Sequence, residues 1–249
     1  MIGSAHARGG LAALAILLAG AASCRELPAL PEAEVYVLGE LHDNPDHHRA
    51  QAAMIAAIGP AAVAFEMLAP VQAARIGPDT PRDETLGALL AWERSGWPDF
   101  AIYLPVFQAF DAPVVGAGGT DARDLSAYGL DEALPAAEQA EREALQAAAH
   151  CDALPADLLP SFVARQREVD ARLAHATLAA LDRHGPPVVL IAGNGHARTD
   201  WGVPAAIARV RPEVRVVSVI QGEGGAVPPG DVTLTAAAPE RGDPCAAFR

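Results

Sequence analysis

Short apolar runs recur along the chain and are separated by stretches in which apolar residues return at helical spacing. The five runs are Val35–Leu38, Ala61–Phe65, Pro113–Val115, Val188–Ile191 and Arg215–Ile220. Short strands that alternate with helices are typical of βαβ units, whose strands lie parallel in one sheet. The pattern therefore predicts an α/β fold with a mostly parallel central sheet flanked by helices.

The stretch from residue 121 to about residue 184 differs from the rest because it contains no clear strand run. Its periodicity predicts one helix at Glu138–His150 and a longer helix at Leu158–Leu181. We interpret this stretch as a helical insertion, or lid, that packs over the edge of the sheet. A further helix is expected after the first run, with Asp46 as its N-cap.

The first 23 residues have the pattern of a bacterial secretory signal peptide. A weakly basic start precedes an unbroken run of apolar and small residues, Leu11–Ala22, which is too short to span a bilayer. The small residues before Cys24 resemble the lipobox of bacterial lipoproteins, although Ala21 stands where Leu is usual. We therefore expect export and a lipid on Cys24, with ordinary signal cleavage as the alternative.

A lipid on Cys24 would anchor the protein to a bacterial membrane, facing the periplasm or the outer surface. Residues 24–33 then form a linker, and residues 34–249 form a single domain. Cys151 and Cys245 remain, and an exported compartment permits a disulfide between them. Two free buried thiols are the alternative, because the spacing of these cysteines fits no motif.

Composition and charge narrow the classes of function. Of the residues, 51% are hydrophobic and 20% are charged, which fits a globular chain with a sizeable core. The formal net charge is −13, and there are no basic runs, so nucleic acid is not an expected partner. Every one of the 18 basic residues is Arg, which excludes a mechanism that needs a Schiff-base or P-loop lysine.

Chemically active side chains follow three of the predicted strands. Glu40 and His42 come directly after the first run, Glu66 ends the second, and His196 follows the fourth in a Gly-Asn-Gly-His turn. Ligands of open parallel sheets bind outside the carboxyl ends of the strands, so these groups are expected to meet. A carboxylate beside an imidazole can exchange protons or bind a metal.

Each of these strand-end residues also has a simpler interpretation. Glu66 could be an exposed loop acid, and His196 could be incidental in a turn whose glycines allow a positive φ or a close backbone approach. Asp43, Asn44 and Asp46 are better explained as turn and cap residues. A charged pair at a buried strand end needs partners, which favours a function for Glu40 and His42.

A second set of polar residues carries weaker signals. His47 and His48 occupy the first turn of the expected helix, where one could face the site and the other solvent. His150 could reach the site or only complement a helix dipole, and a solvated helix face explains Gln166 and Asp170 equally well. The full set of weaker candidates is His47, His48, His150, Gln166, Asp170 and Asn194.

These residues together resemble a known family. Gly39-Glu40-Leu41-His42-Asp43-Asn44 with His47-His48, Phe65-Glu66-Met67, Gln166 with Asp170, and Ala192-Gly193-Asn194-Gly195-His196 followed by Trp201-Gly202-Val203-Pro204 are similar to the motifs of ChaN-like lipoproteins. That family belongs with the Tiki, TraB and erythromycin-esterase-like proteins. The resemblance spans about residues 34 to 220.

The resemblance implies an α/β core and an iron-regulated lipoprotein that binds haem and takes part in iron or haem uptake, with a possible homodimer around two stacked haems. It implies haem-binding roles for Glu40, His42, His47, His48, Glu66, His150, Gln166, Asp170, Asn194, His196 and Arg198. Many members carry a Tyr after the last His, where this chain has Arg198-Thr199-Asp200-Trp201. A His must then hold the iron, or haem is not the ligand.

Three functions remain open from the sequence. The leading one is a haem-binding lipoprotein, in which Arg198 would pair with the haem propionates. The alternative is a hydrolase of the esterase or metallopeptidase type, with Glu40 or His42 as base, Glu66 or His196 completing the site, and a divalent metal in place of haem. The third is an anchored scaffold with a degenerate site.

Overall fold

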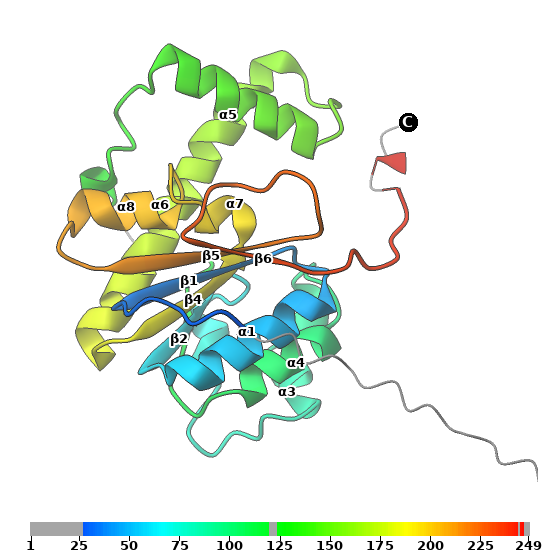
Figure 1. Ribbon diagram of the computed structural model, residues 1–249, viewed down its shortest axis with the longest axis vertical. Coiled ribbons are helices and arrows are strands. Elements are labelled where there is room, and N and C mark those ends of the chain that lie inside the picture. The colour runs from blue at the N-terminus through cyan, green and yellow to red at the C-terminus, as the bar shows by residue number, and fades with distance from the viewer. Residues whose placement is uncertain (1–26, 120–123, 244, 247–249) are drawn as a thin grey trace, which may run out of the picture.

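The computed structural model describes residues 27–119, 124–243 and 245–246, so the expected signal peptide and Cys24 lie outside the described residues. The predicted α/β fold is confirmed, and all neighbouring strands pair in parallel. Figure 1 shows the sheet, whose strand order is β3-β2-β4-β1-β5-β6. The strands are β1 Val35–Glu40, β2 Ala62–Phe65, β3 Val114–Gly116, β4 Val188–Gly193, β5 Val216–Gly222 and β6 Val232–Thr235.

The five apolar runs correspond to β1 to β5, with small shifts at their ends. The clearest difference is in β1, which continues through Gly39 to Glu40, beyond the end of the predicted run at Leu38. Strand β6 was not expected, because its apolar Val232 and Leu234 alternate with threonines rather than forming a run. This alternation suits an edge strand with one face towards the core.

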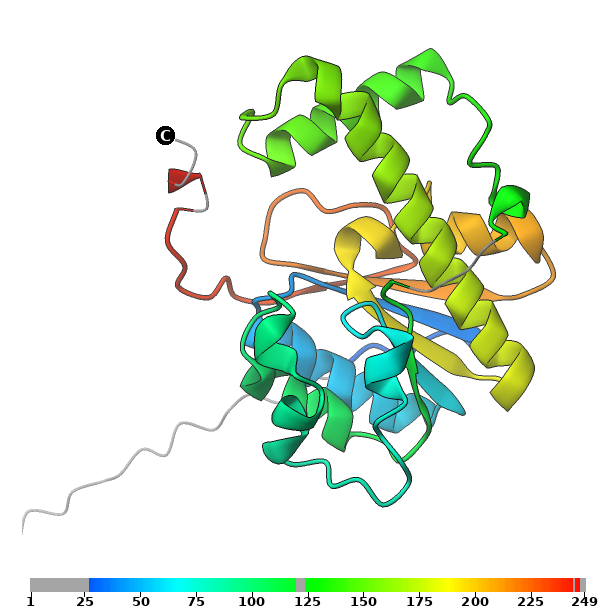
Figure 2. The same ribbon diagram turned by 180° about the vertical axis from the view of Figure 1, so that it is seen from behind.

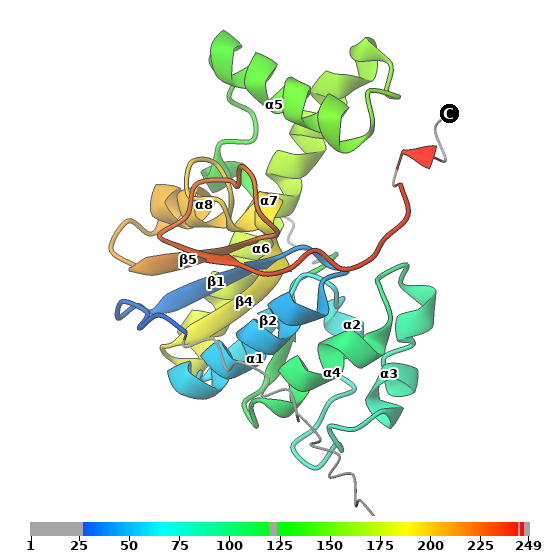
Figure 3. The ribbon, with the colours of Figure 1, turned by 45° about the vertical axis from the view of Figure 1, so that its right-hand side comes forward.

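Helices cover both faces of the sheet. The α-helices are α1 Pro45–Ile58, α2 Pro70–Ala73, α3 Thr85–Leu89, α4 Phe100–Gln108, α5 Ala136–Ala149, α6 Leu159–His184, α7 Asn194–Ala197 and α8 Val203–Val210. Three short 3₁₀ segments lie at η1 Trp92–Arg94, η2 Ser126–Tyr128 and η3 Ala156–Leu158. Figure 3 shows α1, α3 and α4 on one side of the sheet and α6 and α8 on the other.

The start of α1 differs from the expectation. The N-cap is Asn44 rather than Asp46, because the Asn44 side chain accepts a hydrogen bond from the Asp46 backbone N–H at 2.9 Å. Pro45 then occupies the first helical position, where its missing N–H costs nothing. This cap fixes the direction in which the chain leaves the end of β1.

The two faces of the sheet are packed by different residue types. The α1 and α4 side is aromatic: the rings of Phe65 and Phe107 stack with centroids 4.5 Å apart, and Trp92 and Tyr103 pack beside them. The opposite side is filled mainly by small and aliphatic residues, many of them from α6. The aromatic side therefore holds the larger side chains next to the end of β1.

The predicted helical stretch divides into two parts. The second half of α6, which carries Leu173 and Leu181, packs on the sheet. Helix α5 and the beginning of α6 extend beyond the sheet, as Figures 1 and 2 show. No helix in the described part of the chain has both the length and the hydropathy to cross a membrane.

A disulfide joins Cys151, in the turn between α5 and α6, to Cys245 in the C-terminal tail. Of the two alternatives left open by the sequence, the structure therefore has the disulfide. The tail is also held at the sheet edge, because Arg241 forms ion pairs with Asp43 and Glu223. The tail is thus joined covalently to the turn between α5 and α6 and by ion pairs to the carboxyl end of the sheet.

Candidate functional site

The candidate site lies at the carboxyl ends of β1, β2 and β4, which are neighbours in the sheet. Glu40 and Gly193 are partners in the parallel register of β1 and β4. The backbone N–H of Glu66 donates to the Ile191 carbonyl at 3.0 Å, so the residue after β2 is held against β4. The sheet therefore brings the three chemically active segments to one edge, as parallel pairing requires.

Glu40 is the buried anchor of the site, and its residue is 1% exposed. Its carboxylate accepts hydrogen bonds from Gln51 Nε2 at 2.8 Å and from Tyr103 Oη at 2.7 Å. His42 Nδ1 lies 2.8 Å from the carboxylate, and His48 Nδ1 lies 3.3 Å from it. Burial alone would raise the pKa of Glu40, but the hydrogen bonds from the two imidazoles lower it to about 2.

His42 is oriented by Glu40 and leaves one ring nitrogen available. Burial lowers the pKa of His42, but the hydrogen bond and charge of Glu40 outweigh it, so the pKa is raised. The ring packs 4.7 Å from the Trp97 ring, and the side chain is 30% exposed. Nε2 has no hydrogen-bond partner within the described residues. An imidazole with a carboxylate on Nδ1 and a free Nε2 can bind iron or exchange protons.

His196 is held between two carboxylates. Its Nδ1 lies 2.6 Å from Asp170 Oδ1, and its Nε2 lies 3.4 Å from Glu66 Oε1. Gln166 Nε2 is 3.1 Å from the same Nδ1. Burial lowers the pKa of His196, but the hydrogen bonds to Asp170 and Glu66 dominate and raise it. The pKa of Asp170 is also raised, because burial outweighs its bond to His196.

Gly193 leaves the space in which the side chains of His42 and Glu66 lie close to each other. A Cβ at this position would lie 2.9 Å from His42 Nε2 and 3.8 Å from Glu66 Oε2. The need is for space and not for a left-handed backbone, because neither Gly193 nor Gly195 has a positive φ. The expected Gly-Asn-Gly-His turn is in fact the short helix α7. The carboxylates and imidazoles of the site therefore lie next to one another around Gly193.

Three other predicted residues, His47, His48 and Asn194, have mainly structural contacts. His47 and His48 are both buried, so neither faces solvent. His47 Nδ1 accepts from the Leu41 N–H at 3.0 Å, and His48 Nε2 lies 3.0 Å from the His42 carbonyl oxygen. Asn194 pairs through both ends of its amide with the backbone of Gln221 on β5.

Two predicted residues have contacts outside this cluster. His150 Nδ1 lies 2.8 Å from the Gln146 carbonyl oxygen, and its ring packs on Phe162 in the α5–α6 region. Arg198 pairs with Asp200, and its guanidinium lies 3.5 Å from the centroid of the Trp201 ring. The structure therefore brings together Glu40, His42, His48, Glu66, Gln166, Asp170 and His196, and not His150 or Arg198.

Three residues that contact the site were not anticipated from the sequence. Gln51 and Tyr103 bond to Glu40 from α1 and α4, and Trp97 precedes α4 and packs on His42. All three lie far along the chain from any strand end. Helical spacing marks Gln51 and Tyr103 only as inward-facing, and Trp97 lies outside any helix, so no sequence signal singles the three out.

Within the described ranges, no group of three or more His, Cys, Asp or Glu side chains is arranged to hold a metal ion. What the described side chains do form is two acid–imidazole arrays, one around His42 and one around His196. Each can hold or transfer a proton.

Comparison with known proteins gives a consistent result. A family model described as "Haem-binding uptake, Tiki superfamily, ChaN" matches residues 27–207. The solved structure described as "Cofacial heme binding to ChaN of Campylobacter jejuni" has a TM-score of 0.61 and 22% identity, over 81% of this chain and 86% of that chain. The search of curated proteins found no match.

Two other solved structures are more distant. A mutant of the erythromycin esterase EreC in its open conformation has a TM-score of 0.43 and 14% identity, over 76% of this chain and 70% of that one. The type III effector HopBA1 has a TM-score of 0.40 and 15% identity, over 82% of this chain and 88% of that one.

Proposed function

The chain belongs to the ChaN family of haem-binding uptake proteins in the Tiki superfamily, and from this membership we propose that it binds haem and serves haem or iron uptake. The binding site in this proposal is the carboxyl edge of the sheet, where His42 would hold the iron. The observation that carries the proposal is the pairing of a buried carboxylate with one nitrogen of a partly exposed imidazole.

The donor set around His42 fits haem iron. The hydrogen bond from Nδ1 to Glu40 fixes the ring and increases the basicity of Nε2, which is the arrangement that metal-binding histidines commonly have. Bound haem would supply the iron that this nitrogen would coordinate. Apolar contact is available from Trp97 and from Leu41, which is 36% exposed.

Tyrosine does not provide a competing ligand near His42 in this chain. Residue 201 is Trp, and its ring packs against Arg198. Tyr103 is fully buried, and its hydroxyl donates a hydrogen bond to the Glu40 carboxylate. The pKa of Tyr103 is raised because burial disfavours the phenolate. A phenolate ligand is therefore disfavoured, which supports an imidazole in that role.

We also propose export, anchoring through a lipid on Cys24, and assembly of two copies around stacked haems. The Cys151–Cys245 disulfide supports export, because such bonds persist in oxidising compartments. The stacked arrangement follows the cofacial heme binding named for the Campylobacter jejuni ChaN structure. An exposed Leu41 next to the proposed ligand is suited to an apolar contact between copies.

A haemin titration tests the proposal. Wild-type protein should give a saturable Soret band at micromolar concentration, with one haem for each chain. His42→Ala should weaken binding at least about tenfold, since it removes the iron–nitrogen bond. His175→Ala is the matched control, because His175 is an exposed histidine on α6, and it should bind as the wild type does.

Two results would overturn haem binding at this site. One is a wild-type titration with no saturable Soret band. The other is a His42→Ala protein that folds and binds haemin as tightly as the wild type. Circular dichroism of each variant separates loss of the ligand from loss of the fold.

Hydrolysis is the second candidate, favoured by the two acid–imidazole arrays on either side of Gly193. In this case His42 is the general base, and Glu40 holds it in the required orientation. Turnover of an activated ester that disappears in both His42→Ala and Glu40→Gln, without any haem, would favour hydrolysis. Turnover that persists in both variants would reject it.

A further inference from the structure

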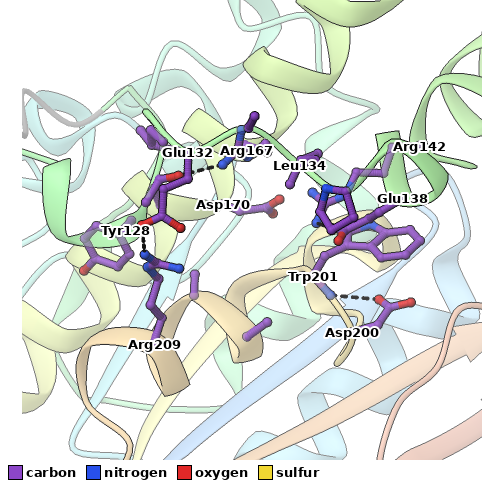
Figure 4. Close-up of a pocket in the computed structure, with 17 residues that line it drawn as sticks. Tyr128, Glu132, Leu134, Glu138, Arg142, Arg167, Asp170, Asp200, Trp201 and Arg209 are labelled. Carbon is purple, nitrogen blue, oxygen red and sulfur yellow. Dashed lines mark hydrogen bonds and ion pairs between the residues drawn. The ribbon is translucent and has the colours of Figure 1, made fainter. Parts of the chain in front are cut away.

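A cavity of about 320 Å³ lies on the α6 and α8 side of the molecule, away from His42. Figure 4 shows its walls, which come from η2, the beginning of α5, the middle of α6, the α7–α8 loop and α8. Charged and aromatic side chains line it, among them Tyr128, Arg142, Arg167, Asp170, Trp201 and Arg209. Its volume lies at the lower end of the range for small-molecule sites.

Asp170 connects this cavity to the candidate site. Its side chain is 3% exposed, and Oδ1 is used by the bond to His196 at 2.6 Å. Oδ2 is buried and has no hydrogen-bond partner within the described residues. Figure 4 shows the carboxylate directed into the cavity. A buried carboxylate oxygen without a partner is costly, so this atom marks a place for a hydrogen-bond donor.

The guanidinium groups give the cavity its second feature. Arg142 pairs with Glu138 and Arg209 pairs with Glu132, so these two are locally neutralised. Arg167 donates to the Gly129 carbonyl at 2.6 Å and has no acid partner among the described ion pairs. Burial lowers the pKa of Arg167, and the repulsion of Arg142 and Arg209 works in the same direction, against the attraction of Glu138 and Glu132. An anion that pairs directly with Arg167 would offset the repulsion by the two neighbouring arginines.

Aromatic surfaces restrict the shape of the ligand. The Arg142 guanidinium lies 4.7 Å from the centroid of the Trp201 ring, and the Nε atom of Arg142 is buried without a hydrogen-bond partner. Trp201 and Tyr128 are each half-buried. The cavity therefore combines Arg167, a cation that forms no ion pair within the described residues, with one buried acceptor and aromatic walls.

We propose that this cavity binds a small organic acid that carries a hydroxyl or amino donor. Its carboxylate pairs with Arg167, and its donor hydrogen-bonds to Asp170 Oδ2. A planar guanidinium recognises a carboxylate in a bidentate way, and a second polar contact selects among acids of similar size. The proposal does not depend on haem binding.

A ligand that binds in the cavity should alter the hydrogen bond that His196 makes with Asp170. Asp170 is shared, because one carboxylate oxygen contacts the imidazole and the other faces the ligand. A hydrogen-bond donor on Oδ2 draws negative charge away from the carboxylate. This changes the hydrogen bond between Oδ1 and His196 Nδ1, and with it the position of the proton between them. The ligand therefore acts as an effector of the candidate site through Asp170.

The experiment uses L-malate as the probe and succinate as its analogue without the hydroxyl, both followed by calorimetry on the disulfide-intact protein. L-malate should bind with 1:1 stoichiometry and at least about tenfold more tightly than succinate. Arg167→Gln should weaken L-malate binding by about tenfold or more. Arg165→Gln is the control, because Arg165 is exposed on the same helix and pairs with Glu168.

Nitrogen NMR of the His196 ring locates the binding. L-malate should shift the His196 signals in the wild type and in Arg165→Gln, but not in Arg167→Gln at the same concentration. Equal binding of succinate and L-malate would overturn the role of Asp170. No saturable L-malate binding, or binding unaffected by Arg167→Gln, would overturn the site. A haemin titration of the same samples shows independently whether haem binding has failed.

Discussion

Asp170 on α6 holds His196 from outside the sheet, with Oδ1 2.6 Å from the imidazole Nδ1. Glu66 lies on the other side of the ring, and its second oxygen, Oε2, accepts the Gly193 N–H at 2.8 Å. The imidazole is thus fixed by one acid from a covering helix and one from a strand end. This arrangement favours the protonated ring in the folded state.

The raised pKa of His196 predicts a loss of stability at alkaline pH. In the folded protein the hydrogen bonds to Asp170 and Glu66 outweigh burial and raise this pKa above its ordinary value of 6.5. The stabilisation that the protonated His196 ring gives to the folded state is therefore complete below pH 6.5 and is lost as the pH rises through the pKa of the folded protein. Urea unfolding at pH values from about 6 to about 9 should show this decline.

Asp170→Asn tests the origin of that decline. Asn keeps an oxygen near Nδ1 but removes the charge, so the free energy of unfolding should depend less on pH in this range. Asp182→Asn is the control, because Asp182 is on the same helix and its side chain is 63% exposed. An unchanged slope in Asp170→Asn would show that the pair does not hold the proton.

The lowered pKa of Glu40 predicts a loss of stability at acid pH. Its hydrogen bonds to His42 and His48 outweigh burial and lower its pKa from 4.5 to about 2. The stabilisation is present above 4.5 and is lost as the pH falls from 4.5 towards the folded pKa. At about 1.4 kcal/mol per pKa unit, its full size is about 3 kcal/mol.

Glu40→Gln should remove most of this acid dependence, as measured by urea unfolding between about pH 5 and about pH 3. Glu84→Gln is the control, because Glu84 is exposed before α3. The same Glu40→Gln protein should bind haemin about tenfold or more weakly, since the imidazole loses its orienting partner. Wild-type acid sensitivity in Glu40→Gln would contradict the assignment.

The strand-end residues of the site follow from the sequence, and the helix residues do not. Glu40, Glu66 and His196 each follow an apolar run within a few residues, and parallel pairing brings such positions to one edge. Gln51 and Tyr103 come from helices whose rotation is set by packing, including the stack of Phe65 on Phe107. Periodicity identifies the buried face of a helix but not which polar group on it reaches an acid.

Asp170 is a further residue whose place in the site could not be predicted from the sequence. Its spacing from Gln166 fits an exposed helix face as well as a buried one, and the residue is 2% exposed. Burial arises because α6 lies between His196 and the polar cavity, and neither contact can be read from local sequence. The same holds for the disulfide, whose cysteines are 94 residues apart.

Removal of the disulfide should lower stability. For a closed loop of the size set by the 94-residue separation, the constraint on the unfolded chain contributes about 4.7 kcal/mol. Cys151→Ser with Cys245→Ser should therefore unfold at lower urea concentration than the oxidised wild type. Reductant should destabilise the wild type to a similar extent and leave the double variant unchanged, and equal midpoints for all samples would contradict a stabilising bond.

Gly193→Ala is the most selective test of the site geometry. The added methyl group would lie 2.9 Å from His42 Nε2, which is closer than carbon and nitrogen tolerate. The ring cannot move away freely, because Glu40 holds Nδ1 and Trp97 packs on its face. We expect haemin affinity to fall about tenfold or more, with a stability cost of about 1–3 kcal/mol.

Gly195→Ala is the matched control two residues away. A Cβ there has Gln166 Nε2 as its nearest neighbour at 3.6 Å, an ordinary van der Waals distance. The residue is exposed in α7, where Ala is favoured over Gly by about 1 kcal/mol, so stability and haemin affinity should be unchanged or improved. If Gly193→Ala binds haemin as tightly as Gly195→Ala, the haem does not use the His42 nitrogen that faces Gly193, and the assignment of His42 as the residue that holds the iron is wrong.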